Sequence, residues 1–217
     1  MMNMRGAGFC QIAVCLLVMW MLAALPAAAE TPEAAIAKVQ TAVDTRDASL
    51  LQQYVDLPGI IGAGVDSYVQ TLARSGAEKG GTIAPMIAMM LPSLQKNDST
   101  AAAVRSMLIE ETRSFVVYGV SSGQFAGKPV PGKAGTGMFA PLYADASLGR
   151  KEIRAVKNVR QQGKEATAQL RVYDFGSERE YPIDVRMADK GDHWQVVEVR
   201  NLSDLVGRLR KEAAENQ

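Results

Sequence analysis

The strongest constraint on the fold is an alternation of side chains in the last quarter of the sequence, residues 151–202. Small or apolar side chains occupy every second position in two runs: Ala166, Ala168, Leu170 and Val172, and then Tyr181, Ile183, Val185 and Met187. A period of two is typical of a β-strand with one buried and one solvent-facing side. A less regular run from Ile153 to Val159 and the run from Trp194 to Arg200 have strand composition as well.

Short polar turns separate these runs. Each turn contains a glycine, at Gly163, Gly176 and Gly191. Glycine supplies the positive φ that tight hairpins need, so consecutive strands are expected to pair antiparallel. Residues 151–202 therefore predict an antiparallel sheet of three to four strands.

Helical patterns precede this sheet. Thr31, Pro32 and Glu33 form a helix start with a capping hydroxyl, a proline in the first turn and an early acid. Apolar residues at helical spacing follow, and further helices are expected after Asp47, after Pro58, around residues 86–94 and from residue 97 to a stop at Gly119. Residues 30–118 should form a helical layer on the sheet, and residues 203–217 a short C-terminal helix. This order predicts an α+β fold.

A segment rich in glycine and proline connects the helices to the sheet. Ten of the residues from Gly119 to Gly149 are glycine or proline, too many for a regular element. A connection of this length is usually a lid, a binding loop or a mobile segment, so residues 119–150 are expected to be a loop. No composition break divides residues 30–217, which predicts a single domain.

The first 29 residues have the organisation of a secretory signal peptide. Arg5 is followed by an apolar run from Ile12 to Leu25, and small residues end at Ala29. Such a segment is removed on export, and cleavage is expected after Ala29. The alternative is an uncleaved membrane anchor, which would need ~20 apolar residues. The protein is therefore expected to be periplasmic or secreted and to meet the membrane through this segment only.

Removal of the signal peptide from the 217 residues would leave 188, with no cysteine and a formal net charge near zero. A chain of this length can bury an adequate core without disulfides. A balanced charge gives no reason to expect nucleic acid as a partner. His193 is the only histidine, so a zinc site of several His and Cys ligands is excluded by count, and no metal or other cofactor is expected.

Short pieces of the sequence resemble an uncharacterised family of small exported bacterial proteins. They are Val43 to Asp47, Leu50 to Pro58, and the closing Trp194-Gln-Val-Val-Glu-Val. The order of elements also resembles the cone fold of nuclear transport factor and ketosteroid isomerase. That resemblance implies helices packed into the concave face of a curved sheet, and it carries over no catalytic residue.

Three local signals have both a chemical and a structural interpretation. The run from Gly127 to Lys133 approaches a phosphate-binding loop, but Ala134 replaces the Mg²⁺-binding hydroxyl and two prolines lack N–H groups. We therefore interpret it as a surface loop. Met86, Met89 and Met90 could bind copper, but their helical spacing favours core packing. His193, beside a predicted turn, is interpreted as a surface residue rather than a catalytic base.

A pocket on the concave side of the sheet is a further possibility. Its candidate lining is aromatic: Tyr54, Tyr68, Phe115, Tyr118 and Trp194. Asp56 or Asp66 would be the acid, as in isomerases that pair a buried carboxylate with a tyrosine hydroxyl. The alternative is that these aromatic residues fill the core, with Trp194 as a structural residue.

The sequence leaves three functions open. The first is a non-enzymatic exported module that binds a small ligand or a partner protein in the cell envelope. The second is a small isomerase- or dehydratase-like enzyme with a buried carboxylate. The third is an envelope structural or assembly protein, which a large exposed apolar patch on the helices would favour.

Overall fold

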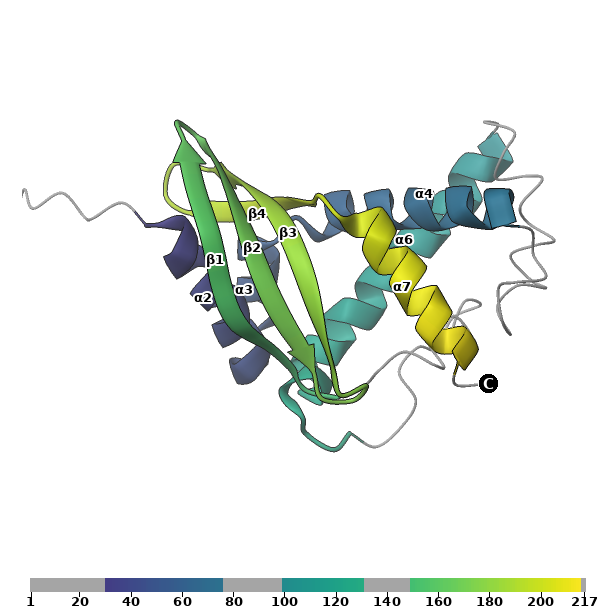
Figure 1. Cartoon of the computed structure of the whole chain (residues 1–217), viewed down its shortest axis with the longest axis horizontal. Coiled ribbons are helices and arrows are strands. Elements are labelled where there is room, and N and C mark those ends of the chain that lie inside the picture. The colour runs from purple at the N-terminus through teal and green to yellow at the C-terminus, as the bar shows by residue number, and fades with distance from the viewer. Residues whose placement is uncertain (1–29, 76–98, 131–148, 216–217) are drawn as a thin grey trace, which may run out of the picture.

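The computed structural model describes residues 30–75, 99–130 and 149–215 (Figure 1). In this part of the chain, helices come first, a four-stranded antiparallel sheet follows, and a helix ends the fold. This order confirms the predicted α+β class. The signal peptide, the three methionines at positions 86, 89 and 90, and residues 131–134 of the phosphate-loop-like run lie outside the described residues.

Two helices open the fold, and side chains cap both. Helix α2 spans Pro32–Thr45, and the Thr31 hydroxyl accepts a hydrogen bond from the Ala34 amide at 3.2 Å. Helix α3 spans Ala48–Tyr54, and the Asp47 carboxylate accepts one from the Leu50 amide at 2.9 Å. Each cap satisfies an N–H group that has no partner inside its helix.

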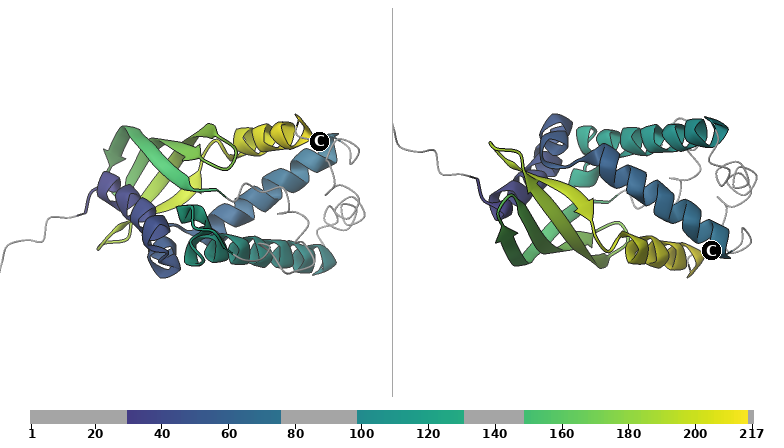
Figure 2. Two further views of the ribbon diagram at one scale, coloured as in Figure 1. Left: turned by 90° about the horizontal axis from the view of Figure 1, so that it is seen from below. Right: turned by 90° about the horizontal axis from the view of Figure 1, so that it is seen from above.

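Three further helices lie beyond one end of the sheet. They are α4 (Leu57–Ser75), α6 (Ser99–Ser121) and α7 (Leu202–Glu215). Figure 2 shows α4 running between α6 and α7, all directed away from the strands. No helix among the described residues is both long and apolar enough to cross a membrane.

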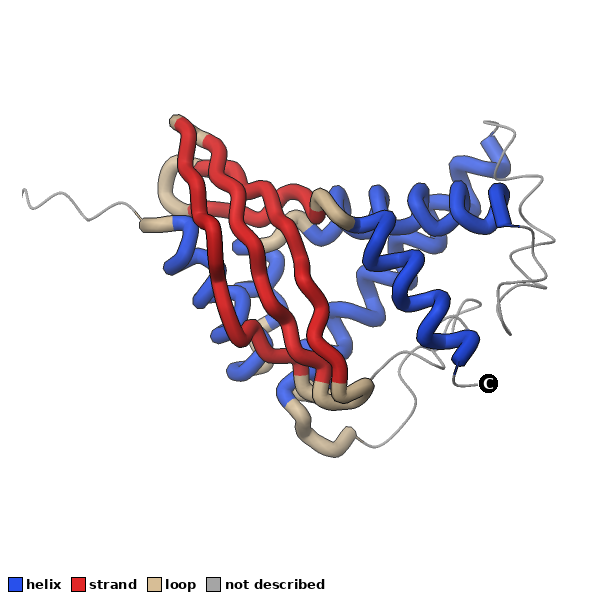
Figure 3. The backbone as a smooth tube through the Cα atoms, in the orientation of Figure 1, coloured by secondary structure: helices blue, strands red, loops and turns tan. Residues whose placement is uncertain are grey.

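The sheet is a meander in the order β1-β2-β3-β4, with every neighbouring pair antiparallel. The strands are β1 (Lys151–Gln162), β2 (Glu165–Asp174), β3 (Arg179–Asp189) and β4 (Trp194–Val199). The register places the apolar members of the two alternating runs opposite one another, for example Ala168 opposite Val185. Figure 3 shows the long strands bending along their length, so the sheet has a concave and a convex face.

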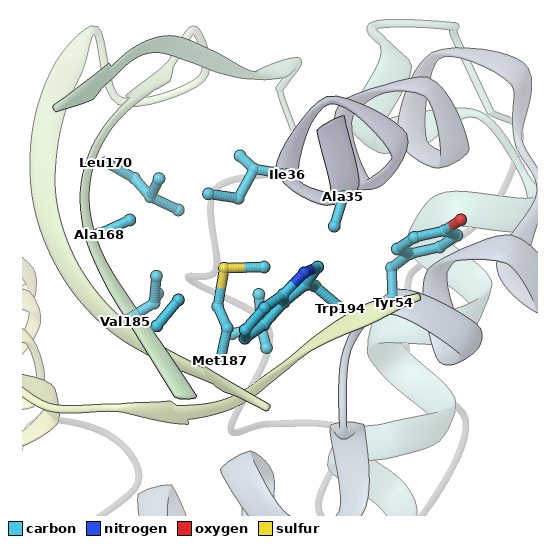
Figure 4. Packing of buried hydrophobic residues seen from close by; sticks show 10 residues of the cluster. Ala35, Ile36, Tyr54, Ala168, Leu170, Val185, Met187 and Trp194 are labelled. Atoms are coloured by element: carbon cyan, nitrogen blue, oxygen red, sulfur yellow. The ribbon is translucent and has the colours of Figure 1, made fainter. Parts of the chain in front are cut away.

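Side chains from α2 and the sheet fill the concave face. Ile36 of α2 and Met187 of β3 are completely buried there, beside Trp194 (Figure 4). A second cluster, formed by Ala42, Leu51, Leu57, Ile61 and Val120, joins the four helices α2, α3, α4 and α6. These two clusters hold the helical layer on the sheet.

The segment after α6 differs from the expected loop. Helix α6 continues past Gly119 to Ser121, and a 3₁₀ helix, η3 (Gln124–Ala126), follows. A side chain at Gly119 would overlap the Phe125 ring, so this glycine permits close packing and does not end the helix. The residues of this segment with a left-handed conformation are Gly123, at φ 84°, and Gly127, at φ 77°.

Candidate functional site

The two candidate acids have structural roles at helix ends and surfaces. Asp56 caps α4, because its carboxylate accepts a hydrogen bond from the Gly59 amide at 3.1 Å. Its own amide donates to the Val196 carbonyl at 2.9 Å, which ties this cap to β4. Asp66 forms a bidentate ion pair with Arg105, at 2.5 and 2.6 Å, and both side chains are nearly half exposed.

The structure brings together only two of the five candidate aromatic residues in one buried cluster. Tyr54 and Trp194 belong to the concave core, with 7% and 4% of their surfaces exposed. Phe115 packs edge-on against Phe125 at 6.0 Å. Tyr118 is 39% exposed on α6. Tyr68, the fifth candidate, is partly buried on α4.

A hydrogen-bonded cluster joins the first described residue to the sheet. The Tyr54 hydroxyl donates to one oxygen of Glu30 at 3.0 Å, and the Trp194 amide donates to the other at 3.2 Å. Burial, and then the bond to Glu30, raise the pKa of Tyr54 above its ordinary value. This carboxylate–tyrosine pair fixes the start of α2 against the β3–β4 hairpin.

His193 lies in the predicted turn, but its side chain is only 15% exposed. Nε2 lies 3.1 Å from the Gln53 carbonyl, and Nδ1 lies 2.6 Å from the Asp192 carboxylate. The ring also packs edge-on against Tyr54 at 5.4 Å. His193 thus lies in the turn, as expected, and the end of α3 covers part of its imidazole.

An open pocket among the described residues lies on the convex face, on the side of the sheet away from the aromatic core. We call it the convex groove; its volume is about 450 Å³. Four of its lining residues are charged: Arg160, Asp184, Arg200 and Asp204. Uncharged polar residues complete most of the wall: Asn158, Thr167, Gln169 and Asn201. The groove is therefore a polar surface feature rather than an apolar cavity.

An irregularity in β1 places two of these residues. Lys157 pairs with Gln169 and Arg160 pairs with Thr167, so β1 holds one more residue than β2 over this stretch. The extra residue makes a β-bulge, in which Asn158 adopts φ 52° and its side-chain amide donates to the Gln169 side chain. Asparagine tolerates this left-handed conformation better than most residues. Bulges re-aim side chains and are common beside functional sites.

The opposite wall is fixed by Asn201, at the corner between β4 and α7. Its side-chain oxygen accepts from the Asp184 amide at 3.0 Å, and its nitrogen donates to the Pro182 carbonyl at 2.9 Å. The Arg200 amide donates to the Asp184 carbonyl at 2.7 Å. Backbone hydrogen bonds thus hold Asp184 and Arg200 in fixed positions and leave their side chains to line the groove.

The convex groove was not predicted from the sequence. The alternation in the strands places the side chains at positions 167, 169 and 184 on the solvent-facing side of the sheet and does not indicate a groove there. The signal was the break in alternation at Lys157-Asn158-Val159-Arg160, which marks the bulge. No group of three or more His, Cys, Asp or Glu suited to a metal ion occurs among the described residues.

Comparison with known proteins gives this site no precedent. No family model, curated protein or solved structure matches the chain. The resemblances to a family of exported bacterial proteins and to the cone fold stay predictions. The site must be interpreted from its own geometry.

Proposed function

We propose that residues 30–217 form an exported, non-enzymatic binding module of the cell envelope, with a small polar ligand in the convex groove. The observation that carries this proposal is the contrast between the two faces of the sheet. Core side chains fill the concave face, whereas the convex face has an open groove of about 450 Å³ lined by charged and amide side chains. A few convergent polar groups in a concave site are typical of small-ligand recognition.

Two features support export. The first 29 residues have the charge and hydropathy pattern of a signal peptide. The carboxylate of Glu30, the first residue after the expected cleavage position, is bonded to Tyr54 and Trp194. Both bonds use the side-chain carboxylate of Glu30 and neither uses its backbone nitrogen. A chain that began at Glu30 would therefore keep them.

The positions of Asp56 and Asp66 are why we propose a non-enzymatic role. A helix cap and a surface ion pair use these carboxylates for stability. Of the described large apolar side chains with high exposure, Met107 and Tyr118 lie on α6, Phe175 lies in the turn between β2 and β3, and Leu209 lies on α7. The binding role is the one that the convex groove favours.

A thermal-shift screen of small polar solutes against the mature chain tests the proposal. Solutes that bind should raise the melting temperature of the parent, and the increase should be lost in Arg200→Met. Arg171→Met is the matched control, because Arg171 lies on the same face but pairs with Glu180 outside the groove. Hits that stabilise Arg200→Met as much as the parent would refute a site in the convex groove.

A further inference from the structure

Among the described residues, charged side chains around the convex groove form ion pairs, whereas those that line it do not. Arg171 pairs with Glu180, and Arg186 pairs with Glu198 at 2.6 Å and with Glu165 at 3.2 Å. Within the part of the chain that the structure describes, the four charged groove side chains form no ion pair. The groove thus holds two cations and two anions that do not neutralise one another by direct contact.

These four charges come from different elements. Arg160 lies on β1, Asp184 on β3, Arg200 directly after β4, and Asp204 in the first turn of α7. The bulge at Asn158 and the hydrogen bonds of Asn201 determine where their backbones lie. The fold therefore places opposite charges along one groove without bringing them into direct contact.

We infer that the convex groove recognises a zwitterion, a small molecule that carries both a carboxylate and an ammonium group. This inference rests on the proposed binding function and names the chemical class of its ligand. Arg160 or Arg200 would bind the carboxylate, and guanidinium groups suit this role because they donate two parallel hydrogen bonds. Asp184 or Asp204 would accept hydrogen bonds from the ammonium.

Ligands with a single charge fit less well. An anion that reaches an arginine in the groove also approaches Asp184 or Asp204. A cation that reaches one of these aspartates also approaches an arginine. Repulsion from the like charge offsets much of the gain in both cases. Only a ligand with two opposite charges uses both kinds of side chain.

The test is a titration of the mature chain with ω-amino acids of increasing length, from glycine through 4-aminobutyrate to 6-aminohexanoate. The series keeps both charges and changes only their separation. Butyrate and butylammonium are the single-charge probes. Calorimetry should show that at least one ω-amino acid binds ten times more tightly than either single-charge probe.

Charge-removing variants assign the two ends of the ligand. Arg160→Met or Arg200→Met should weaken binding of the preferred ω-amino acid at least tenfold without weakening binding of butylammonium. Asp184→Asn or Asp204→Asn should weaken binding of the same ω-amino acid at least tenfold without weakening binding of butyrate. Arg171→Met and Glu180→Gln are the matched controls and should keep the parent affinity, because their ion pair lies outside the groove.

The possible failures separate this inference from the proposed function. If no ω-amino acid binds, or if the single-charge probes bind equally well, the zwitterion inference is overturned. A neutral or singly charged solute whose binding depends on Arg200 would then still support a binding module. If every solute that binds is indifferent to all four groove variants, both proposals fail.

Discussion

Trp194 is the residue through which the first strands, the first helix and the last hairpin meet. Its indole lies in the concave core with Met187 and Ile36, and only 4% of the residue is exposed. The sequence predicted this structural role, because an aromatic residue at the start of an alternating strand has one face to bury. An apolar cavity on this side would have needed space that these side chains occupy.

Replacing Trp194 with alanine should lower the free energy of unfolding by ~3–5 kcal/mol, the usual cost of truncating a buried aromatic residue. Urea denaturation followed by far-ultraviolet circular dichroism measures this change, since Trp20 would leave with the signal peptide and no tryptophan fluorescence would remain. Trp194→Phe should lower the free energy of unfolding much less, because it keeps an aromatic ring at this position. A Trp194→Ala variant that unfolds at the parent's urea concentration would show that the residue is not buried.

Gly119 allows a second test at single-residue scale. Gly119→Ala should destabilise the fold by ~1–3 kcal/mol, because the added methyl group would overlap the Phe125 ring. Gly64→Ala, inside α4 with no atom near the new methyl group, should instead stabilise by ~0.4–1 kcal/mol. Chemical denaturation of both variants measures the difference. Equal effects at the two positions would contradict the packing role of Gly119.

The elements of this fold were predictable to different degrees. The period of two in β2 and β3 depends on local burial, so the sequence shows it directly. The start of α4 was placed after Pro58, although Asp56 before Leu57 and Pro58 is a capping pattern. The convex groove could not be predicted, because its walls come from β1, β3 and the β4–α7 corner. Only the register, with its bulge, brings these residues together.

Helix α7 is attached to the sheet through Glu212. This carboxylate accepts hydrogen bonds from Tyr181 at 2.6 Å and from Arg208 at 2.8 Å, and it pairs with Arg179 at 2.9 Å. Burial would raise the pKa of Glu212, but the bonds from Tyr181, Arg208 and Arg179 outweigh it, so the pKa falls below its ordinary value. The ionised carboxylate is therefore the form that holds α7 on β3.

This pKa shift makes a prediction about acid stability. A carboxylate whose pKa is lower in the folded state stabilises the fold above the unfolded pKa, and the contribution disappears as the pH falls through the folded pKa. Glu212→Gln should lose roughly 1–3 kcal/mol at neutral pH, as expected for charge-assisted hydrogen bonds. The gap to the parent should close in acid, below both pKa values.

Thermal unfolding across a pH series measures this convergence. Glu110→Gln is the control, since Glu110 is an exposed residue paired with Arg113 on its own helix. Because this pair is exposed to solvent, that variant should lose far less stability than Glu212→Gln at neutral pH. A Glu212→Gln variant whose deficit stayed constant from neutral to acid pH would contradict the assigned ionic role.

At the scale of the whole molecule, hydrogen bonds hold the first described residue, Glu30, in place. Glu30 bonds to α3 and to the last hairpin, so both ends of the described chain are connected to the sheet, at Glu30 and at Glu212. If the protein is exported as proposed, the chain isolated from the cell envelope should begin at Glu30. Intact-mass measurement with N-terminal sequencing checks this, and a chain that retained residues before Glu30 would refute cleavage after Ala29.

We propose that the ligand binds the convex groove and not the concave side of the sheet. Chemical-shift mapping on the ¹⁵N-labelled mature chain, titrated with the solutes that stabilise it, distinguishes the two faces. We expect shifts in the amides of Gln169, Asp184 and Asn201, with little change at Ile36, Met187 and Trp194. Shifts centred on Ile36, Met187 and Trp194, with the groove amides unchanged, would contradict it.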